Sequence, residues 1–128
     1  MSTRLLIDTD VLIDYLRGRP EAVQYLDGRA EALLISVITV AELYAGVREG
    51  NERTSLDQFI RAFQLVPVDP AIAQKGGLFR RDYFKSHNVA LPDALIAATA
   101  ESVQATLVTL NQKHFPMLGN VSVPYKKP

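Results

Sequence analysis

Apolar and polar positions along the chain form two alternating patterns, which together predict a regular series of strands and helices. Short apolar runs that end at a polar residue or a turn are typical of buried strands. Between these runs, apolar residues recur every three or four positions, as they do on the buried face of a helix. The runs predict strands at Arg4–Asp8, Leu33–Ser36, Leu65–Val68, Thr106–Thr109 and Val121–Val123.

The helical segments are bounded by residues that favour helix starts and ends, such as Pro in a first turn and Gly after a last one. A cap at Asn51 or Thr54 is expected to begin the helix that carries Leu56. The Gly76-Gly77 pair weakens the helical pattern around it, because glycine is a poor helix former. The predicted helices are Asp10–Arg17, Pro20–Arg29, Thr39–Glu49, one after Asn51, one from Pro70 to Ser86, Pro92–Val103 and a short turn at Gln112–Phe115.

This alternation of strands and helices predicts an α/β fold with a mostly parallel central sheet, flanked by helices on both faces. With 128 residues, of which 48% are hydrophobic, the chain is long enough for one domain over residues 1–128 with a real core. The absence of cysteine excludes a disulfide scaffold and thiolate metal sites. The first strand begins at Arg4 without a cleavable leader, and no apolar run reaches membrane-spanning length, so we expect a cytoplasmic protein.

Charge adds little at first, because 14 Lys and Arg residues balance 14 Asp and Glu residues. The distribution is less even than the total, since no acid follows Glu101 while several lysines do. Most such basic residues form a solvated surface in ordinary proteins. The basic residues in question are Lys75, Arg80, Arg81 and Lys85 in one stretch, and Lys113, Lys126 and Lys127 after Glu101.

Three acidic residues occupy places that a parallel sheet brings together. Asp8 ends the first predicted strand, and Glu42 and Asp93 fall in the first turns of predicted helices. Helices that follow parallel strands begin at the carboxyl edge of the sheet, where ligands bind in open α/β folds. Ile96 and Ala100 lie on the same helix face as Asp93, which predicts that this carboxylate points inward. We therefore expect the three acids to converge.

Each acid also has a simpler explanation. The segment Thr39–Glu42 fits a capping box, in which the glutamate satisfies a backbone N–H. Asp10 and Asp93 lie near helix starts, where the helix dipole favours a carboxylate by ~0.3–1 kcal/mol. We interpret Asp10 as a cap or a support for its neighbours, and Asp14 as solvent-facing. Asp8 is harder to explain, because a strand position offers it no capping role, so the set of three carries the hypothesis.

Converging carboxylates repel one another, and a divalent cation relieves the repulsion. Oxygen ligands suit Mg²⁺ or Mn²⁺, which keep several waters and bind substrate phosphates. Such ions activate water and stabilise charge on phosphoryl oxygens. His87 follows a helix in a polar loop and is interpreted as a surface residue. The chain has no Gly-rich phosphate loop and no GxSxG elbow, so nucleoside triphosphate chemistry and acyl transfer lack support.

Four segments, in order and across almost the whole chain, resemble one family. They are LLIDTDVLIDYL, ISVITVAELYAGV, LPDALIAATA and TLVTLNQKHF. The resemblance is to the PIN-domain nucleases and, within them, to the VapC-type toxins of bacterial toxin–antitoxin pairs. Each segment alone is a weak motif, whereas their order and spacing together are a strong signal. The length of the chain also matches a single PIN-like domain.

The resemblance implies a metal-dependent endoribonuclease that hydrolyses RNA phosphodiesters with a water activated by Mg²⁺ or Mn²⁺. Matched residue by residue, the catalytic and metal-binding acids are Asp8, Glu42 and Asp93. Thr9 and Asp10, which lie within the first segment, are assigned a supporting role.

The chain departs from the family in the fourth segment, where members often carry a further acid. Asn111 and His114 occupy the corresponding places here. We keep Asn111 as an accessory metal ligand and assign His114 no role. The departure leaves open whether one or two metal ions bind.

The resemblance also implies partners: an RNA substrate, a cognate VapB-type antitoxin whose tail covers the acidic groove, and a second copy of the chain in a homodimer. RNA binding needs positive charge beside the acidic centre. The candidates for RNA contact are Arg80, Arg81, Lys85 and Lys113. Apolar helical residues can serve either interface, although we expect them to be core; they are Leu43, Tyr44, Phe59 and Phe63.

Two other functions remain open. The segment Asp8–Leu12 also resembles the first motif of haloacid dehalogenase-type phosphatases, in which the first Asp is a covalent nucleophile. No downstream Gly-Asp and acid pair supports that reading. A non-catalytic PIN-like binding or regulatory domain would keep the scaffold, and the change at Asn111 and His114 favours it. The three acids argue against it, because a scaffold without activity has no evident need for converging charges.

Overall fold

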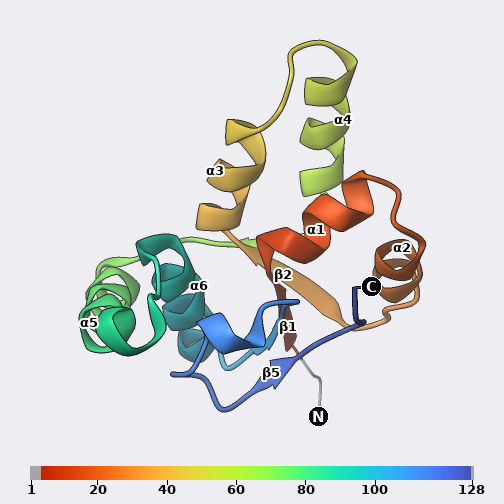
Figure 1. Cartoon of the computed structure of the whole chain (residues 1–128). Coiled ribbons are helices and arrows are strands. Elements are labelled where there is room, and N and C mark those ends of the chain that lie inside the picture. Colours follow the sequence, from red (N-terminus) through yellow and green to blue (C-terminus); the bar gives the residue numbers. More distant parts are fainter. Residues whose placement is uncertain (1–3, 128) are drawn as a thin grey trace.

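Five short strands form a parallel sheet in the order β3-β2-β1-β4-β5. The computed structural model describes residues 4–127 (Figure 1). The parallel sheet predicted from the sequence is therefore confirmed. The strands are β1 (Arg4–Ile7), β2 (Ala32–Ser36), β3 (Gln64–Val66), β4 (Thr106–Val108) and β5 (Val121–Ser122).

Helices cover both faces of the sheet, as predicted, because neighbouring residues of a strand point to opposite sides. Leu5 and Ile7 of β1 pack in one hydrophobic cluster with residues of the first four helices. Leu6, between them, packs in a second cluster with α6. The helices are α1 (Thr9–Leu16), α2 (Pro20–Asp27), α3 (Val37–Ala45), α4 (Asn51–Ile60), α5 (Pro70–His87), α6 (Leu91–Ser102) and the short 3₁₀ turn η1 (Gln112–His114).

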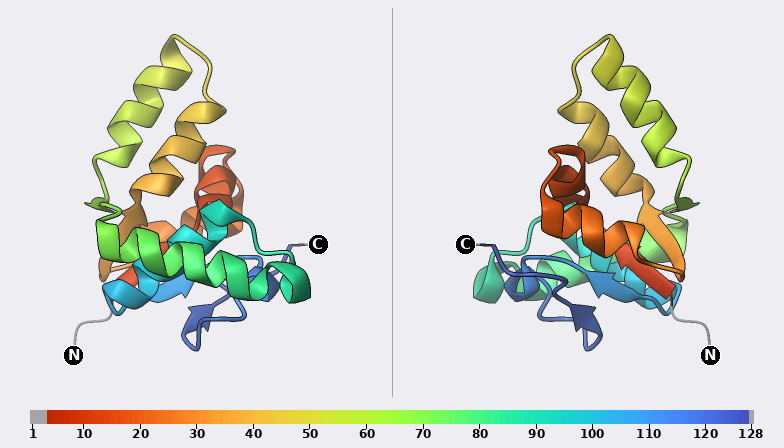
Figure 2. Two further views of the ribbon diagram at one scale, coloured as in Figure 1. Left: turned by 90° about the vertical axis from the view of Figure 1, so that its left-hand side faces the viewer. Right: turned by 90° about the vertical axis from the view of Figure 1, so that its right-hand side faces the viewer.

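Helices α3 and α4 stand side by side and project away from the sheet (Figures 1 and 2). Apolar residues on and next to these two helices belong to the core, as the sequence predicted. Leu43 is buried, and Tyr44, Phe59 and Phe63 are half-buried against the same cluster. The ring of Phe59 stacks on that of Tyr15 in α1, with 5.1 Å between the ring centroids.

The start of α3 differs from the prediction. The helix begins at Val37, because the Ser36 hydroxyl accepts a hydrogen bond from the Ile38 N–H at 3.0 Å. Thr39 therefore lies inside the helix and is fully buried. The expected capping box between Thr39 and Glu42 is wrong, since neither residue lies at the helix end.

The start of α4 and the end of β3 also differ from the prediction. Neither Asn51 nor Thr54 caps α4; Gly50 holds the N-cap position with a φ of 96°, a backbone conformation that glycine adopts without strain. Strand β3 ends at Val66 rather than Val68, since Pro67 has no N–H to donate to a neighbouring strand. The spacing of apolar residues did not predict these two ends, because they depend on the backbone of single residues, Gly50 and Pro67.

Helix α5 continues through the Gly76-Gly77 pair without a break. Gly76 is buried against α6, and a Cβ at this position would lie 3.2 Å from the Leu95 Cα and clash with the Leu95 side chain. Glycine here allows α5 and α6 to approach closely. Although α5 has 18 residues, no helix in the described part of the chain is long and apolar enough to cross a membrane.

Candidate active site

Asp8 lies at the carboxyl edge of the sheet, where β1 ends and α1 begins. Its Oδ1 accepts a hydrogen bond from the Thr9 N–H at 2.8 Å, and its Oδ2 accepts one from the Thr109 hydroxyl at 2.7 Å. The side chain is only 5% exposed. Asp8 is therefore the N-cap residue of α1. The expectation that a strand position leaves it without a capping role is wrong, because the strand stops one residue earlier, at Ile7.

The surroundings of Asp8 disfavour its charged form. Burial raises the pKa of this carboxyl to about 7, and the charges of Asp10 and Asp93 add to the increase. The hydrogen bonds from Thr109 and Thr9 act in the opposite direction but do not cancel it. A cation beside Asp8 would reverse this balance, because an opposite charge favours the ionised form.

Asp10 joins α1 to the segment that follows β4. Its Oδ1 accepts a hydrogen bond from the Val11 N–H at 2.7 Å. Its Oδ2 accepts one from the Leu110 N–H at 3.1 Å and one from the Asn111 side-chain amide at 3.0 Å. Burial raises the pKa of Asp10, while the backbone N–H groups of Leu110 and Val11 oppose the increase. Asn111 therefore lies beside Asp10 and uses its amide N–H₂ to hold it.

Glu42 is held by a short chain of hydroxyl groups. The Thr9 hydroxyl lies 2.7 Å from Oε1 of Glu42 and 3.0 Å from the Thr39 hydroxyl. A hydroxyl has one proton, so Thr9 donates to the carboxylate and accepts from Thr39. Thr9 and Thr39 are both buried, whereas Glu42 is exposed. The buried hydroxyls therefore fix one oxygen of an otherwise solvent-facing carboxylate.

Asp93 lies in the first turn of α6, two residues after the helix start at Leu91. Its Oδ2 is 3.6 Å from Nδ1 of His114, which η1 carries. Burial raises the pKa of Asp93, and the charges of Glu42 and Asp10 add to the increase while His114 opposes it. His114, which the sequence left without a role, thus faces one of the acids.

The acids act on one another across the carboxyl edge of the sheet. The pKa of Asp8 responds to Asp10 and Asp93, and that of Asp93 responds to Glu42 and Asp10. Ile96 and Ala100 are buried beneath Asp93 on α6, in the stripe that the sequence predicted. Among residues 4–127, no three His, Asp or Glu side chains form a group arranged to hold a metal ion directly.

Thr109 is a site residue that the sequence did not single out. It is fully buried and follows the last residue of β4. Its hydroxyl donates to Asp8 and accepts a hydrogen bond from the Asn111 N–H at 3.1 Å. One signal in the sequence could have identified it. Thr109 is a polar residue directly after an apolar strand, as Asp8 is after β1.

Asp14 was expected to face solvent, and this is wrong because the C-terminal segment covers it. The side chain is almost fully buried. It accepts a hydrogen bond from the Tyr125 hydroxyl at 2.8 Å and pairs with Lys127 Nζ at 3.0 Å. Arg19 Nε lies 3.9 Å away. Burial opposes ionisation, but the hydrogen bonds from Lys127 and Tyr125 outweigh it and lower the pKa of Asp14.

The four basic residues proposed for RNA contact lie on two elements. Arg80, Arg81 and Lys85 are on the second half of α5. The Arg80 guanidinium lies over the Phe84 ring, 3.7 Å from its centroid, and Arg81 pairs with its neighbour Asp82 at 2.8 Å. Lys113 is in η1, next to His114. Their contact with RNA stays a prediction.

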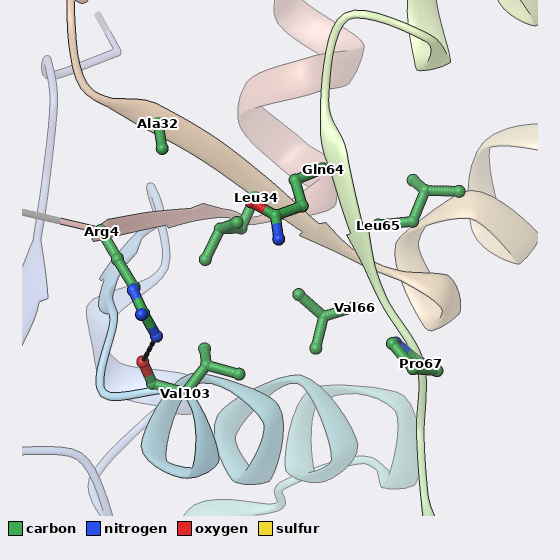
Figure 3. Close-up of a pocket in the computed structure, with 8 residues that line it drawn as sticks. All are labelled: Arg4, Ala32, Leu34, Gln64, Leu65, Val66, Pro67 and Val103. Carbon is green, nitrogen blue, oxygen red and sulfur yellow. Dashed lines mark hydrogen bonds between the residues drawn. The ribbon is translucent and has the colours of Figure 1, made fainter.

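A hollow of about 240 Å³ lies away from the acids, between β2, β3 and the end of α6 (Figure 3). Its only charged lining residue is Arg4, which donates a hydrogen bond to the Val103 carbonyl at 3.0 Å. The walls are otherwise formed largely by apolar side chains such as Leu34 and Val66. No carboxylate lines this hollow, so it is separate from the acid cluster.

Comparison with known proteins gives the same family for the sequence and for the fold. Residues 5–118 match the PIN domain family. The chain is 40% identical to Ribonuclease VapC10 of Mycobacterium tuberculosis, over 97% of this chain and 95% of that protein. It is 41% identical to Ribonuclease VapC19 of the same organism, over 94% and 98% respectively. The fold is similar to that of a toxin–antitoxin complex from Klebsiella pneumoniae, with a TM-score of 0.83, 31% identity, and coverage of 96% of this chain and 99% of that chain.

Proposed function

Because the chain belongs to the PIN-domain family, we propose that it is an endoribonuclease and the toxin of a toxin–antitoxin pair. The observation that carries the proposal is the group of acids at the carboxyl edge of the sheet, in a chain about equally similar to two proteins named as ribonucleases. Asp8, Glu42 and Asp93 are the proposed catalytic residues. Thr9 positions Asp8 through its N–H and Glu42 through its hydroxyl, while Asp10 holds Leu110 and Asn111 in the segment that follows Thr109.

The donor set fits a hard divalent cation, and we propose Mg²⁺ or Mn²⁺ as the cofactor. The three main candidate ligands are carboxylates, and burial together with mutual repulsion raises the pKa of Asp8 and of Asp93. Mg²⁺ is commonly bound through one or two carboxylates with water in the other positions. When bound, such an ion makes water a stronger nucleophile and stabilises charge on the phosphoryl oxygens.

The hydrogen bonds indicate which oxygens remain available to the ion. Three N–H donors already hold the Asp10 carboxylate, one on Oδ1 and two on Oδ2, so we assign this residue to positioning. Asp8 Oδ1 and Oδ2 each accept one hydrogen bond, which leaves each oxygen a second lone pair. Glu42 Oε1 accepts from Thr9. Asp8, Glu42 and Asp93 would therefore hold the ion, and Asn111 stays an accessory candidate through its carbonyl oxygen.

The proposed partners follow from the same family membership. The similar Klebsiella structure is described as a toxin–antitoxin complex, and we propose that this chain likewise binds a cognate VapB-type antitoxin. We also propose a homodimer, with RNA as the substrate. We propose that the protein acts in the cytoplasm, where such partners would meet it.

The test is cleavage of a structured RNA by purified protein, with Mg²⁺, with Mn²⁺ and with EDTA. Asp93→Asn should abolish cleavage, because it removes a carboxylate from the acid group while keeping the size of the side chain. Glu49→Gln is the matched control, since Glu49 is exposed and pairs with Arg53 away from the site. This variant should cleave like the wild type.

The same assay separates the two alternatives. Activity on a phosphomonoester but not on RNA would indicate a phosphatase. No activity in a folded wild-type protein that still binds a partner would indicate a regulatory domain. Metal-dependent cleavage that survives in Asp93→Asn would contradict the assignment of the site.

A further inference from the structure

A second cavity, of about 410 Å³, opens directly beside the acid cluster. One wall comes from Asp10 and from the segment after β4, and the other comes from the C-terminal segment after β5. Of its lining residues, the proposed catalytic site uses Asp10 and, as an accessory, Asn111, but none from the C-terminal segment. The main lining residues are Asp10, Asn111, Val123, Tyr125, Lys126 and Lys127.

The C-terminal wall of this cavity is anchored to α1 rather than loosely placed. The Tyr125 hydroxyl donates to Asp14 Oδ2 at 2.8 Å, and Lys127 Nζ pairs with Asp14 Oδ1 at 3.0 Å. Asp14 is itself almost fully buried, so the carboxylate that receives both contacts is shielded from water, while Lys127 stays half exposed. The segment between Tyr125 and Lys127 is thereby held at a defined place, and Lys126 lies between the two anchors.

The chemistry of the lining suits a nucleotide. The only carboxylate in the wall, Asp10, is engaged by the N–H groups of Leu110 and Asn111. Lys126 is exposed and makes no ion pair within residues 4–127, so its ammonium is free to meet a phosphate. Val123 is 42% exposed and Tyr125 is half-buried, and together they offer the apolar and aromatic surface on which bases stack.

The cavity also lies next to the acids at which a scissile phosphodiester would bind. The Thr109 hydroxyl is within hydrogen-bonding distance of both Asp8 Oδ2, at 2.7 Å, and Asp10 Oδ2, at 3.4 Å. The cavity wall and the centre of the acid cluster are therefore separated by a single hydroxyl group. A strand whose phosphodiester lies at Asp8 has its neighbouring nucleotide within reach of this cavity.

We propose that the cavity binds the nucleotide next to the scissile phosphodiester, with Lys126 contacting its phosphate and Val123 and Tyr125 packing against its base. This inference rests on the proposed function, because it assumes that RNA is the substrate. It assigns to the C-terminal segment a part in substrate binding, separate from the acids that carry out the cleavage.

The experiment compares Lys126→Gln with Arg48→Gln, a matched loss of one exposed charge at the α3–α4 connection, far along the chain from the cavity. The cleavage site of the wild type is first mapped on a structured RNA. Labelled single-stranded oligonucleotides that contain this site are then shortened one nucleotide at a time from either end. Their binding is measured by fluorescence anisotropy in the Asp93→Asn background, which prevents cleavage, and steady-state cleavage is measured in the active background.

We expect affinity to drop when the nucleotide that reaches the cavity is removed from one end. Lys126→Gln should not show this drop in affinity, and it should bind the longer oligonucleotides several-fold more weakly. It should also lower the slope of log K against log salt by about 0.7, the value for one phosphate on a single strand. KM should rise while kcat stays near the wild-type value. Arg48→Gln should keep the step and the salt dependence.

Other results would overturn the proposal in distinguishable ways. If Lys126→Gln binds the whole series like Arg48→Gln while the wild type cleaves RNA, the cavity is not a nucleotide site and the proposed function stands. If Lys126→Gln instead weakens binding of the purified antitoxin and leaves RNA affinity unchanged, the cavity belongs to the protein partner. If the wild type neither cleaves nor binds RNA, the proposed function fails together with this inference.

Discussion

The hydroxyl of Thr109 lies 2.7 Å from Oδ2 of Asp8, although 101 residues separate the two in the chain. Both residues are buried, and each directly follows a strand of the same parallel pair, β4 and β1. Parallel pairing brings the carboxyl ends of the two strands to the same edge. The hydrogen bond that follows stabilises the charged form of a carboxyl group whose burial disfavours that form.

Replacing Thr109 by valine should impair the site without changing the shape of the side chain. The loss of a hydrogen bond to a carboxylate lowers the free energy of unfolding by about 1.5–3 kcal/mol. Because this hydrogen bond holds the pKa of Asp8 down, that pKa should rise further in the variant. Because Asp8 must be ionised to bind a cation, the acidic limb of the cleavage rate should shift to higher pH. Thr109→Ser keeps the hydroxyl and should keep the wild-type profile; a shift in both variants would contradict the role of the hydroxyl.

Asp8→Asn should abolish cleavage and, without metal, stabilise the protein at alkaline pH. The pKa of Asp8 is raised from 3.8 to about 7 in the folded state, so between these values the folded protein binds more protons than the unfolded chain. The free energy of unfolding therefore falls as pH rises through this window and levels off above it. Asparagine is as good an N-cap as aspartate.

Thermal denaturation of both proteins in EDTA at pH 5 and pH 8 measures this effect. The melting temperature of Asp8→Asn should exceed that of the wild type at pH 8 by more than at pH 5. An Asp8→Asn variant that is less stable than the wild type at pH 8 would show that the charge of Asp8 does not destabilise the folded protein.

Divalent cations should stabilise the wild type more than a variant that lacks one of the acids. A ligand that binds only the folded state adds about 2.7 kcal/mol at a concentration of one hundred times its Kd. We expect Mg²⁺ or Mn²⁺ at pH 8 to raise the melting temperature of the wild type, and to raise that of Asp93→Asn less. Equal increases in melting temperature for the wild type and Asp93→Asn would indicate that the cation binds elsewhere. Glu49→Gln, which removes an exposed carboxylate away from the site, is the control and should respond like the wild type.

Gly76→Ala and Gly77→Ala should have opposite effects on stability, although the two residues are neighbours in α5. A Cβ at Gly76 would lie 3.2 Å from the Leu95 Cα, so alanine should force α5 from α6 at a cost of about 1–3 kcal/mol. A Cβ at Gly77 meets nothing within 4 Å. Alanine there should stabilise the helix by about 0.5–1 kcal/mol. Urea denaturation measures both, and destabilisation of equal size would contradict the packing argument.

The order and type of the strands and helices could be predicted because hydrophobic spacing is local. Their ends were less predictable, since they depend on single backbone groups. Ser36 rather than Thr39 provides the cap of α3, because its hydroxyl accepts from the Ile38 N–H. The apolar run that ends in Asp8 was correctly placed, but the strand stops at Ile7 and Asp8 becomes a helix cap.

The sequence by itself determined the chemistry of the candidate site. Asp8 and Asp93 could be singled out because they lie where an element starts or ends at one edge of a parallel sheet. Glu42 was singled out by its expected place in a first turn, but it lies inside α3. Their role as metal ligands remains a prediction. The family was also evident from the sequence, because the residue types in four short segments, and the order of those segments, can be read without a structure.

Only the tertiary structure decided which groups hold these acids and which surfaces lie beside them. Thr109, Asn111 and the Thr39–Thr9 hydroxyl pair reach the acids from segments 30 to 101 residues away. Asp14 is buried because the C-terminal segment returns to it across 111 residues. A polar residue carries no local mark of a distant partner, since its hydrogen bond forms only when the sheet brings the two segments together.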